Sequence, residues 1–522
     1  MDGMASTAAG VLRGVEEDGL WVFRGVPYAR VAPVAGRWLP PMAPVSWPGV
    51  RDAASWGPIA PQSPPVPGLS LPGDPVETDE DCLNLNIWTP GLDDARRPVL
   101  VWHHGGGFTT GSGASALFDG RQLARAGVVV VTFNYRLGAL GFLAHPDLAV
   151  DGEAGCGNWG LLDQLALLEW IQRHIGEFGG DPGNVTVFGE SAGAMCISDL
   201  LGSPVADGLF RRAVIQSGPP ATATVGWGAR RAERLGALLG IGALGRVALA
   251  QASPQQLVDA TRLLAAEVPG DGGLPLPFLP VVDGGALGRT PEVAMADPSA
   301  PRVPVLIGVT RDEAALYLAA DPSSAGLVPT DVVHRLAKIT STGAAEVVVA
   351  AYSEARAERG EPVSGRDLWT AIVTDFVFRL PSLHLAELHS AHGAAAYSYL
   401  FSWPSPFLGG MFGSCHGLDV PFVFGTVANP AVHPFTGGGE DAFALSLRMQ
   451  QSWLAFARTG DPSCDAVGDW PAYDASRRST MVFGSDADTA SAGVSLEDDP
   501  RGPERAVWDE VDAHPGGGHH HE

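Results

Sequence analysis

Several runs of apolar residues in this chain lack the polar alternation of a strand with one face in water. Each run is short, bounded by glycine or proline, and followed by a stretch with helical spacing; the clearest are Pro98 to Trp102, Gly127 to Phe133, Val185 to Phe188, Val303 to Val309 and Ala394 to Phe401. Because strands that helices cover on both faces are apolar throughout, these runs predict a central, mostly parallel sheet. The predicted fold class is therefore α/β.

The length and the helical segments indicate the domain organisation. The chain has 522 residues, of which 45% are hydrophobic, enough for one large core. No change in composition marks a linker, so we expect a single domain over residues 1–514, with helical insertions around residues 229–270 and 331–390. We expect residues 515–522, which are rich in Gly and His, to form a disordered tail.

The charge balance argues against several classes of partner. The chain has 33 Lys and Arg against 58 Asp and Glu, a formal net charge of -25, which repels nucleic acid and anionic lipid. The N-terminus lacks a signal-peptide pattern, and no stretch reaches the roughly 20 apolar residues that cross a bilayer. We therefore expect a cytoplasmic protein without nucleic-acid or membrane partners. The five cysteines form no C-x-x-C pair, so we expect free thiols, no metal site and no cofactor.

A G-x-S-x-G motif, Gly189 to Gly193, stands between a β-branched run and a stretch compatible with a helix. A nucleophile elbow of the α/β-hydrolase fold requires this context, because small flanking residues let the backbone turn sharply and expose the serine hydroxyl. A structural glycine turn is the competing interpretation, since the bare motif is common by chance. With a strand before it and a helix after it, Ser191 is predicted to be a catalytic nucleophile.

A glycine-rich segment, His104 to Phe108, follows the expected strand that ends at Trp102. Its three glycines leave backbone N–H groups unshielded by side chains, so they can donate hydrogen bonds to an oxyanion. Alone this signal is weak, because such loops also form turns or bind phosphate. Its position upstream of the elbow favours an oxyanion loop.

A serine nucleophile needs a histidine base and a carboxylate, which should follow it in the chain in the order acid, then histidine. Asp312 and Glu313 both follow the expected strand Val303 to Val309. The downstream histidines are His334, His384, His389, His392, His416 and His433. Spacing does not choose among them, although the glycine-bounded loop around His416 favours that residue.

Two long segments resemble the signatures of a known family. The runs Glu80 to Pro90 and Phe178 to Gly193 are closely similar to the two signatures of the type-B carboxylesterase/cholinesterase family. The resemblance extends from Phe23 to Tyr473 and looks greatest to the bacterial p-nitrobenzyl-esterase-like branch. It implies an α/β-hydrolase fold and a serine esterase that hydrolyses uncharged aryl or alkyl esters, with small to medium acyl groups, through an acyl-enzyme intermediate.

Carried over motif by motif, the resemblance implies a catalytic triad of Ser191, Glu313 and His416. The implied oxyanion donors are the N–H groups of Gly106, Gly107 and Ala192. The implied substrate-pocket residues are Phe108, Glu190, Leu274, Leu276, Leu316 and Tyr317. The segment Leu274 to Gly284 is similar to the family strand that lines the acyl pocket, and its two leucines stand where acetylcholinesterases have larger aromatic rings.

The resemblance also implies two ion pairs that brace the fold, Arg37 with Glu80 and Arg136 with Asp163. The sequence departs from cholinesterases in the loop from Gly57 to Glu80, which has no aromatic residue to hold a quaternary ammonium group. We therefore expect a small-molecule ester without choline as the substrate.

Other functions remain open at this stage. An amidase or carbamate hydrolase would use the same triad, and sequence alone does not separate it from an esterase. Some proteins that resemble this family have lost the nucleophile and act as binding modules, but here serine, acid, histidine and glycine loop are all present. The sequence leaves open whether the protein is a monomer or a dimer.

Overall fold

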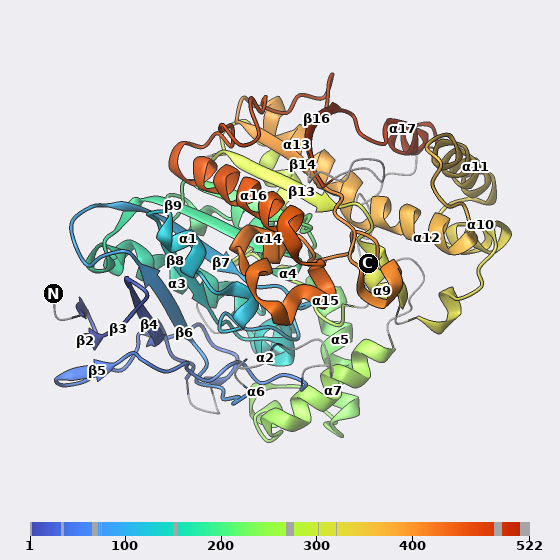
Figure 1. Ribbon diagram of the computed structural model, residues 1–522. Helices are drawn as coiled ribbons and strands as arrows, with labels where there is room; N and C mark the ends of the chain where they lie inside the picture. The colour runs from blue at the N-terminus through green and yellow to red at the C-terminus, as the bar shows by residue number, and fades with distance from the viewer. Residues whose placement is uncertain are drawn as a thin grey trace.

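The computed structural model describes residues 3–32, 36–64, 71, 74, 76–149, 155–267, 276–300, 302–319, 321–484 and 493–511. Its centre is a twisted 11-stranded sheet (Figure 1). In spatial order the strands are β16 (Val494–Asp498), β15 (Ser479–Phe483), β14 (Ala396–Phe401), β13 (Val305–Thr310), β10 (Arg212–Gln216), β9 (Gly180–Glu190), β7 (Arg97–His103), β8 (Val129–Phe133), β6 (Asn84–Thr89), β4 (Leu20–Pro27) and β3 (Val15–Glu17).

The central strands, from β15 across to β8, pair in parallel, which confirms the predicted α/β class. Both edges are antiparallel: β16 pairs with β15 on one side, and β6, β4 and β3 extend the sheet on the other. The apolar-run criterion missed β6, because two of its buried side chains are Asn84 and Asn86. The Asn86 amide donates to Thr132 Oγ1 at 3.1 Å, which satisfies a polar group that would otherwise be costly to bury.

Alternate side chains of the strands enter two separate cores. Val99 and Val101 belong to the core that α3 (Trp159–His174) and α4 (Ala192–Leu201) cover. Leu100 and Trp102 belong to the core on the opposite face, beneath α14 (Val420–Phe424) and α16 (Gly439–Thr459). Successive strand residues point to opposite faces, so cover on both sides accounts for the unbroken apolar runs.

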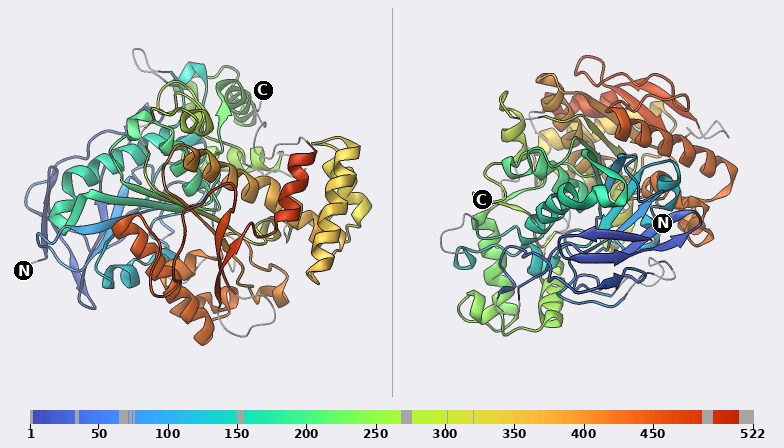
Figure 2. Two further views of the ribbon diagram at one scale, coloured as in Figure 1. Left: turned by 90° about the horizontal axis from the view of Figure 1, so that it is seen from above. Right: turned by 90° about the vertical axis from the view of Figure 1, so that its left-hand side faces the viewer.

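Helices fall within both segments where insertions were predicted. The first segment forms α5 (Val225–Leu238), α6 (Arg246–Leu249) and α7 (Pro254–Ala266). The second forms α10 (Pro329–Leu336), α11 (Thr342–Glu358), α12 (Gly365–Thr374) and α13 (Leu380–Ala391). A third core joins α10 to α12 with Trp508 of α17 (Gly502–Glu510). Figures 1 and 2 show α10, α11 and α12 at the opposite end of the molecule from the N-terminal strands, whereas α5 to α7 lie along the lower side in Figure 1.

The remaining described α-helices and strands are short. They are β1 (Met4–Thr7), β2 (Gly10–Arg13), β5 (Val50–Asp52), β11 (Ala223–Thr224), β12 (Val281–Val282), α1 (Arg121–Arg125), α2 (Gly138–Phe142), α8 (Pro291–Met295), α9 (Ala314–Ala319) and α15 (His433–Thr436).

The two predicted ion pairs are confirmed. Arg37 and Glu80 approach to 2.6 Å, and the fully buried pair of Arg136 and Asp163 approaches to 2.7 Å. All five cysteines are free thiols, as predicted. Among the described helices, none has the length and apolarity that a bilayer span requires.

Candidate active site

Ser191 lies at a sharp turn between the end of β9 and the start of α4. Its backbone has φ 56° and ψ −130°, a conformation that non-glycine residues rarely adopt and that surrounding structure must enforce. The enforcing contact comes from β7: a Cβ atom on Gly193 would lie 2.0 Å from the His103 carbonyl oxygen. Position 193 therefore requires glycine, because the backbone of β7 at His103 lies directly against it, as in a strained nucleophile elbow.

Gly193→Ala should therefore destabilise the elbow. The added methyl group has no room beside the His103 carbonyl, and overpacking of this kind costs about 1 to 3 kcal/mol or more. Urea unfolding would measure the loss. Gly176→Ala is the matched control, because a Cβ atom there meets nothing within 4 Å. Equal stability of the two variants would contradict this account of the turn.

Glu313 and His416 form a close pair. Glu313 stands between β13 and α9 and is fully buried, and its Oε2 lies 2.6 Å from Nδ1 of His416, which follows β14 in the chain. The other carboxylate oxygen accepts hydrogen bonds from Thr310 N at 2.7 Å and the Ser217 hydroxyl at 2.5 Å. These bonds hold the carboxylate in one orientation toward the imidazole.

Asp312, the alternative acid, points elsewhere. Its Oδ2 accepts a hydrogen bond from Ser414 N at 2.8 Å and pairs with Arg311 at 3.0 Å. Asp312 thus ties the start of the His416 loop to the end of β13, while its neighbour faces the imidazole. The other candidate histidines have other surroundings; for example, His389 Nε2 bonds to the Val303 carbonyl at 2.7 Å.

A third carboxylate adjoins the imidazole. His416 Nε2 lies 3.0 Å from Glu190 Oε1, and both residues are buried. Burial alone would lower the pKa of His416, but the carboxylates of Glu190 and Glu313 raise it to about 9. Burial raises the pKa of Glu190 to about 7, against the opposing effect of His416. The site therefore favours a positively charged imidazole flanked by carboxylates.

The glycine-rich loop after β7 lies against the nucleophile. A Cβ atom on Gly105 would come within 2.9 Å of Ser191 Cβ, and Gly106 has φ 116°, outside the range of other residues. The Gly106 carbonyl accepts from the N–H groups of Thr109 and Thr110, which fixes the turn. Among the hydrogen bonds of the described residues, the N–H groups of Gly106, Gly107 and Ala192 have no acceptor. Such free donors beside a serine can bind a negatively charged oxygen.

Comparison with known proteins places this geometry in a family. Residues 2–499 match the carboxylesterase family. The chain belongs to this family. It is 36% identical over 510 residues to the para-nitrobenzyl esterase of Bacillus subtilis, with 96% of this chain and 97% of the relative covered. It is also 36% identical over 504 residues to the phenmedipham hydrolase of Pseudarthrobacter oxydans, with 95% and 98% covered.

Solved structures agree with this placement. A crystal structure of a Geobacillus stearothermophilus carboxylesterase superposes with a TM-score of 0.84 at 38% identity, covering 97% of this chain and all of that chain (100%). A PNB esterase structure superposes with the same TM-score of 0.84 at 33% identity. The chain is therefore a carboxylesterase with the α/β-hydrolase fold, as the resemblance implied.

One predicted pocket residue of this carboxylesterase, Phe108, and the predicted strand around Leu276 differ from expectation. Phe108 is fully buried with its ring centroid 4.9 Å from that of Phe142, so it offers no surface to a ligand. The segment around Leu276 is not the predicted strand: residues 276–280 are irregular, and strand β12 covers only Val281–Val282. Pro277 and Pro280 explain this difference, because proline has no N–H to donate to a sheet.

The other predicted pocket residues lie in varied positions. Leu276 is half-buried. A Cβ atom added to Gly107 would lie 3.3 Å from Leu276 Cδ2, so Leu276 contacts the oxyanion loop. Tyr317 packs beside His416 with ring centroids 5.3 Å apart. Leu316 packs against the core beneath α14 and α16 instead. Leu274 lies outside the described residues.

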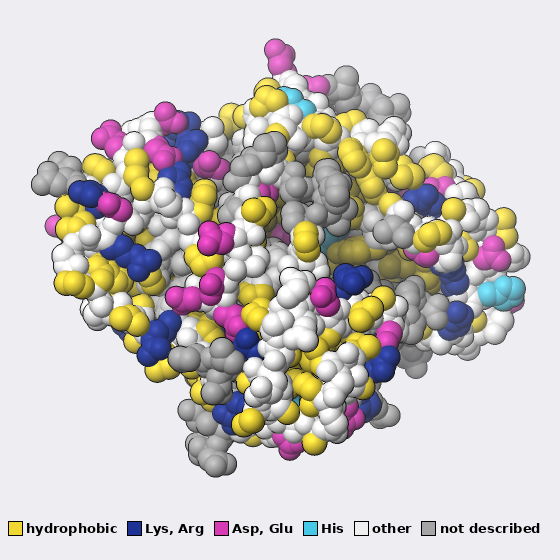
Figure 3. Space-filling view, turned by 90° about the horizontal axis from the view of Figure 1, so that it is seen from below, with side chains coloured by type: hydrophobic (Ala, Val, Ile, Leu, Met, Phe, Trp, Pro, Cys, Tyr) yellow, Lys and Arg dark blue, Asp and Glu magenta, His cyan; other side chains and the backbone are white. Residues whose placement is uncertain are grey.

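A cavity that opens to solvent adjoins the oxyanion loop. Its lining includes Thr109 of that loop, Leu137 and Leu140 near α2, and Leu257 and Thr261 of α7. The face that carries α5 to α7 is hollowed near its middle, with hydrophobic side chains inside the hollow (Figure 3). None of these cavity residues was predicted, because they come from segments that meet only in the folded chain.

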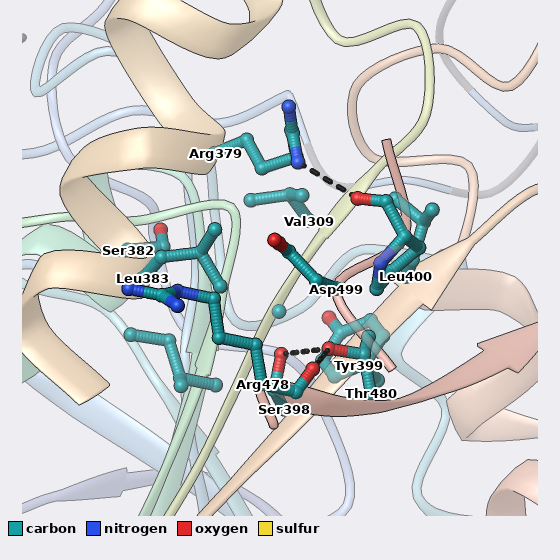
Figure 4. Close-up of a pocket in the computed structure, with 13 residues that line it drawn as sticks. Val309, Arg379, Ser382, Leu383, Ser398, Tyr399, Leu400, Arg478, Thr480 and Asp499 are labelled. Carbon is teal, nitrogen blue, oxygen red and sulfur yellow. Dashed lines mark hydrogen bonds between the residues drawn. The ribbon is translucent and has the colours of Figure 1, made fainter. Parts of the chain in front are cut away.

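Figure 4 shows a second cavity, whose lining includes none of the triad or oxyanion-loop residues. It lies between α13 and the strands β13, β14 and β15, and its two arginines already have acidic partners. Arg379 pairs with Asp375 at 2.7 Å and Arg478 with Glu387 at 3.1 Å. No group of three or more His, Cys, Asp or Glu in the described ranges could hold a metal ion.

Sequence reasoning also missed the residues behind the triad. Ser217 follows the end of β10, which pairs with β9, the strand that ends directly before Ser191. This position at the carboxyl end of a neighbouring strand is the only sequence signal for a role of Ser217 in the site. Asp419, three residues after His416, accepts hydrogen bonds from the Gln216 amide at 2.9 Å and the Tyr399 hydroxyl at 2.8 Å. Burial raises the pKa of Asp419 to about 6.

The carboxylates around His416 predict an unusual pH profile. His416 must be neutral to act as a base, so kcat/KM should rise with pH, and its raised pKa places that rise above the ordinary value of about 6.5. Glu190→Gln removes one negative charge, which should lower the pKa of His416 and move the rise to lower pH by about one unit. Glu313 and Asp419, which also raise the pKa of His416, are unchanged in this variant. An unchanged or upward-shifted profile would contradict the assigned charge interaction.

Proposed function

We propose that this carboxylesterase hydrolyses small, uncharged carboxylic esters, with Ser191 as nucleophile, His416 as base and Glu313 as the acid that orients His416. The proposal is carried by the 2.6 Å contact between Glu313 and His416, whose Nε2 lies 3.0 Å from Glu190, the residue directly before Ser191 at the strained elbow. A weak nucleophile such as a serine hydroxyl needs both a base and an orienting group of this kind.

The proposed reaction has two halves. The Ser191 hydroxyl turns toward His416 Nε2, gives up its proton and attacks the ester carbonyl carbon, while the carbonyl oxygen takes hydrogen bonds from Gly106, Gly107 and Ala192. His416 then protonates the leaving alcohol, and an acyl-enzyme remains. Water repeats the sequence and releases the acid. Each oxyanion donor contributes about 3 kcal/mol to the transition state.

The apolar side chains near the oxyanion loop support the substrate class. Leucine, alanine and valine side chains line much of the adjoining cavity, together with the polar Gln62 and the charged Arg262, and Leu276 contacts Gly107 directly. Within the described residues of the loop from Gly57 to Glu80, no aromatic ring offers a quaternary ammonium site. Turnover of p-nitrophenyl esters with graded acyl lengths tests this class. A clear preference for acetylcholine over neutral acetates would refute it.

Leu276→Phe should restrict the acyl group. The larger ring next to Gly107 takes up room where a longer acyl chain would lie, so butyrate turnover should fall more than acetate turnover. Each methylene in an apolar pocket is worth about 1 to 3 kcal/mol, so the difference in kcat/KM should be at least roughly tenfold. Parallel assays of p-nitrophenyl acetate and butyrate measure it. Equal losses on both esters would place Leu276 outside the acyl pocket.

Carbamate hydrolysis is the second candidate function. It is favoured by one observation, the similarity to a relative named as phenmedipham hydrolase. Matched aryl esters, anilides and carbamates with the same acyl and aryl parts separate the two functions. A higher kcat/KM on the carbamate than on the ester would make the second candidate the primary one.

A further inference from the structure

The residue directly before the three glycines of the oxyanion loop is held by a buried tyrosine. Tyr135 follows β8, the strand beside β7, and its hydroxyl donates a hydrogen bond of 2.7 Å to the backbone carbonyl of His104. The two rings also stack, with centroids 4.4 Å apart and planes at 21°. Both side chains are buried. Tyr135 therefore holds His104 by its backbone and by its ring at the same time.

His104 passes this constraint to the first glycine of the loop. Its Nδ1 lies 2.9 Å from the carbonyl oxygen of Gly105. Because a carbonyl oxygen only accepts hydrogen bonds, Nδ1 must carry the ring proton. Burial lowers the pKa of His104 to about 4, so the ring is neutral at neutral pH with its proton on Nδ1. The Gly105 carbonyl is thus held in one direction.

These contacts set the direction of the oxyanion donors, because C=O and N–H point in opposite directions within one trans peptide plane. The bond from Tyr135 to the His104 carbonyl fixes the peptide that enters the loop. The bond from His104 to the Gly105 carbonyl then orients the N–H of Gly106. Two backbone N–H groups bond to the Gly106 carbonyl and orient the N–H of Gly107 in the same way. The aim of both donors therefore begins at Tyr135.

Tyr135 itself stands on a fixed segment. The backbone N–H of Asn134, directly before it, donates to the Asn84 carbonyl of β6 at 3.0 Å. The backbone N–H of Arg136, directly after it, donates to the buried carboxylate of Asp163 at 3.0 Å. A loop of three glycines has little stiffness of its own, so support from a rigid neighbour is what a precise site requires.

We propose that Tyr135 is a positioning residue, which acts through His104 to hold the oxyanion loop so that the N–H groups of Gly106 and Gly107 meet the charged oxygen of the tetrahedral intermediate. The inference rests on the proposed attack by Ser191. Tyr135 does not touch the substrate. The donors gain most when the carbonyl oxygen becomes charged, so a displaced loop weakens binding of the transition state more than binding of the ester.

Tyr135→Phe tests the proposal, because it keeps the stacked ring and removes only the hydroxyl. A shift of about 1 Å can cost up to about 100-fold in rate, and kcat/KM for p-nitrophenyl acetate should fall about tenfold. Two inhibitors of one shape locate the loss. Ser191 adds to a trifluoromethyl ketone and places a charged oxygen among the donors, so its Ki should rise by the same factor. The matching methyl ketone stays trigonal, and its Ki should change by less than roughly threefold.

Tyr28→Phe is the matched control. The Tyr28 hydroxyl is also buried and also donates at 2.7 Å to a backbone carbonyl, but that carbonyl belongs to Asn134, outside the oxyanion loop. Both variants should lose stability in urea to a similar extent. The ratio of the two Ki values, trifluoromethyl ketone over methyl ketone, should rise only in Tyr135→Phe. An equal rise in both variants, or no rise in Tyr135→Phe, would overturn the proposal.

A second variant applies if Tyr135→Phe does not fold. His104→Phe keeps a ring against Tyr135 and removes the N–H that holds the Gly105 carbonyl, so the same ratio should again rise about tenfold. An unchanged ratio would overturn the proposal. Failure of the proposed function gives a different result: the trifluoromethyl ketone would then inhibit Ser191→Ala as strongly as the parent protein, whatever the effect of Tyr135.

Discussion

Ser191→Ala should lower kcat by on the order of 10⁶ with little change in stability. The effect is this large because the hydroxyl forms the covalent intermediate, and no neighbouring group can take its place: Glu190 and Glu313 already interact with His416. The residual rate would come from the oxyanion donors and substrate binding. Steady-state assays of p-nitrophenyl acetate measure kcat, and thermal unfolding measures stability.

Ser217→Ala is the control that separates a direct effect on the nucleophile from an indirect one. It removes a neighbouring hydroxyl that donates to Glu313 Oε1, the carboxylate oxygen that faces away from His416. The kcat of Ser217→Ala should fall far less than that of Ser191→Ala, because the Ser217 hydroxyl never bonds to the substrate. If the two variants lost activity equally, the assignment of Ser191 as the single nucleophile would lose its support.

Glu313→Gln should lower kcat by about 10⁴, which is the second largest expected effect. The glutamine amide can donate to His416 Nδ1, and this would place the imidazole proton on Nε2, where the base must be free. The variant also loses the charge that stabilises the imidazolium. Kinetic assays across pH, together with unfolding curves, would separate a catalytic loss from a structural one.

Asp312→Asn is the matched comparison for the acid. An asparagine keeps an oxygen that can accept the hydrogen bond from Ser414 N, so the loop before His416 stays in place. Its kcat should change by no more than roughly threefold, the size of one weakened hydrogen bond. If Asp312→Asn abolished activity and Glu313→Gln did not, the acid assignment would be reversed.

The fold was predictable from sequence where one physical cause dominated. Unbroken apolar runs such as Val129–Phe133 arise only where helices cover both faces of a strand, so the parallel centre of the sheet could be predicted. Strand β6 could not, because the partners of its buried Asn84 and Asn86 come from distant segments. The segment after Leu276 is irregular and not the strand that the resemblance implied, because its prolines have no N–H to donate to a sheet.

The candidate site was predictable only in part. The elbow carries its own signal, because the turn at Ser191 needs small residues on both sides in a strand-to-helix context. Glu313 and His416 are 103 positions apart, and local patterns did not distinguish His416 from other histidines without the family resemblance. The contacts that Glu190 and Ser217 make with the triad join separate elements, which composition and spacing do not encode.

Covalent labelling tests the central claim most directly. An organophosphate that reacts with activated serine hydroxyls is mixed with the protein, and peptide mass spectrometry then locates the adduct. The account predicts one equivalent of label on Ser191, loss of esterase activity in proportion to labelling, and no label on a Ser191→Ala variant. Label on another residue, or full activity after complete labelling of Ser191, would contradict it.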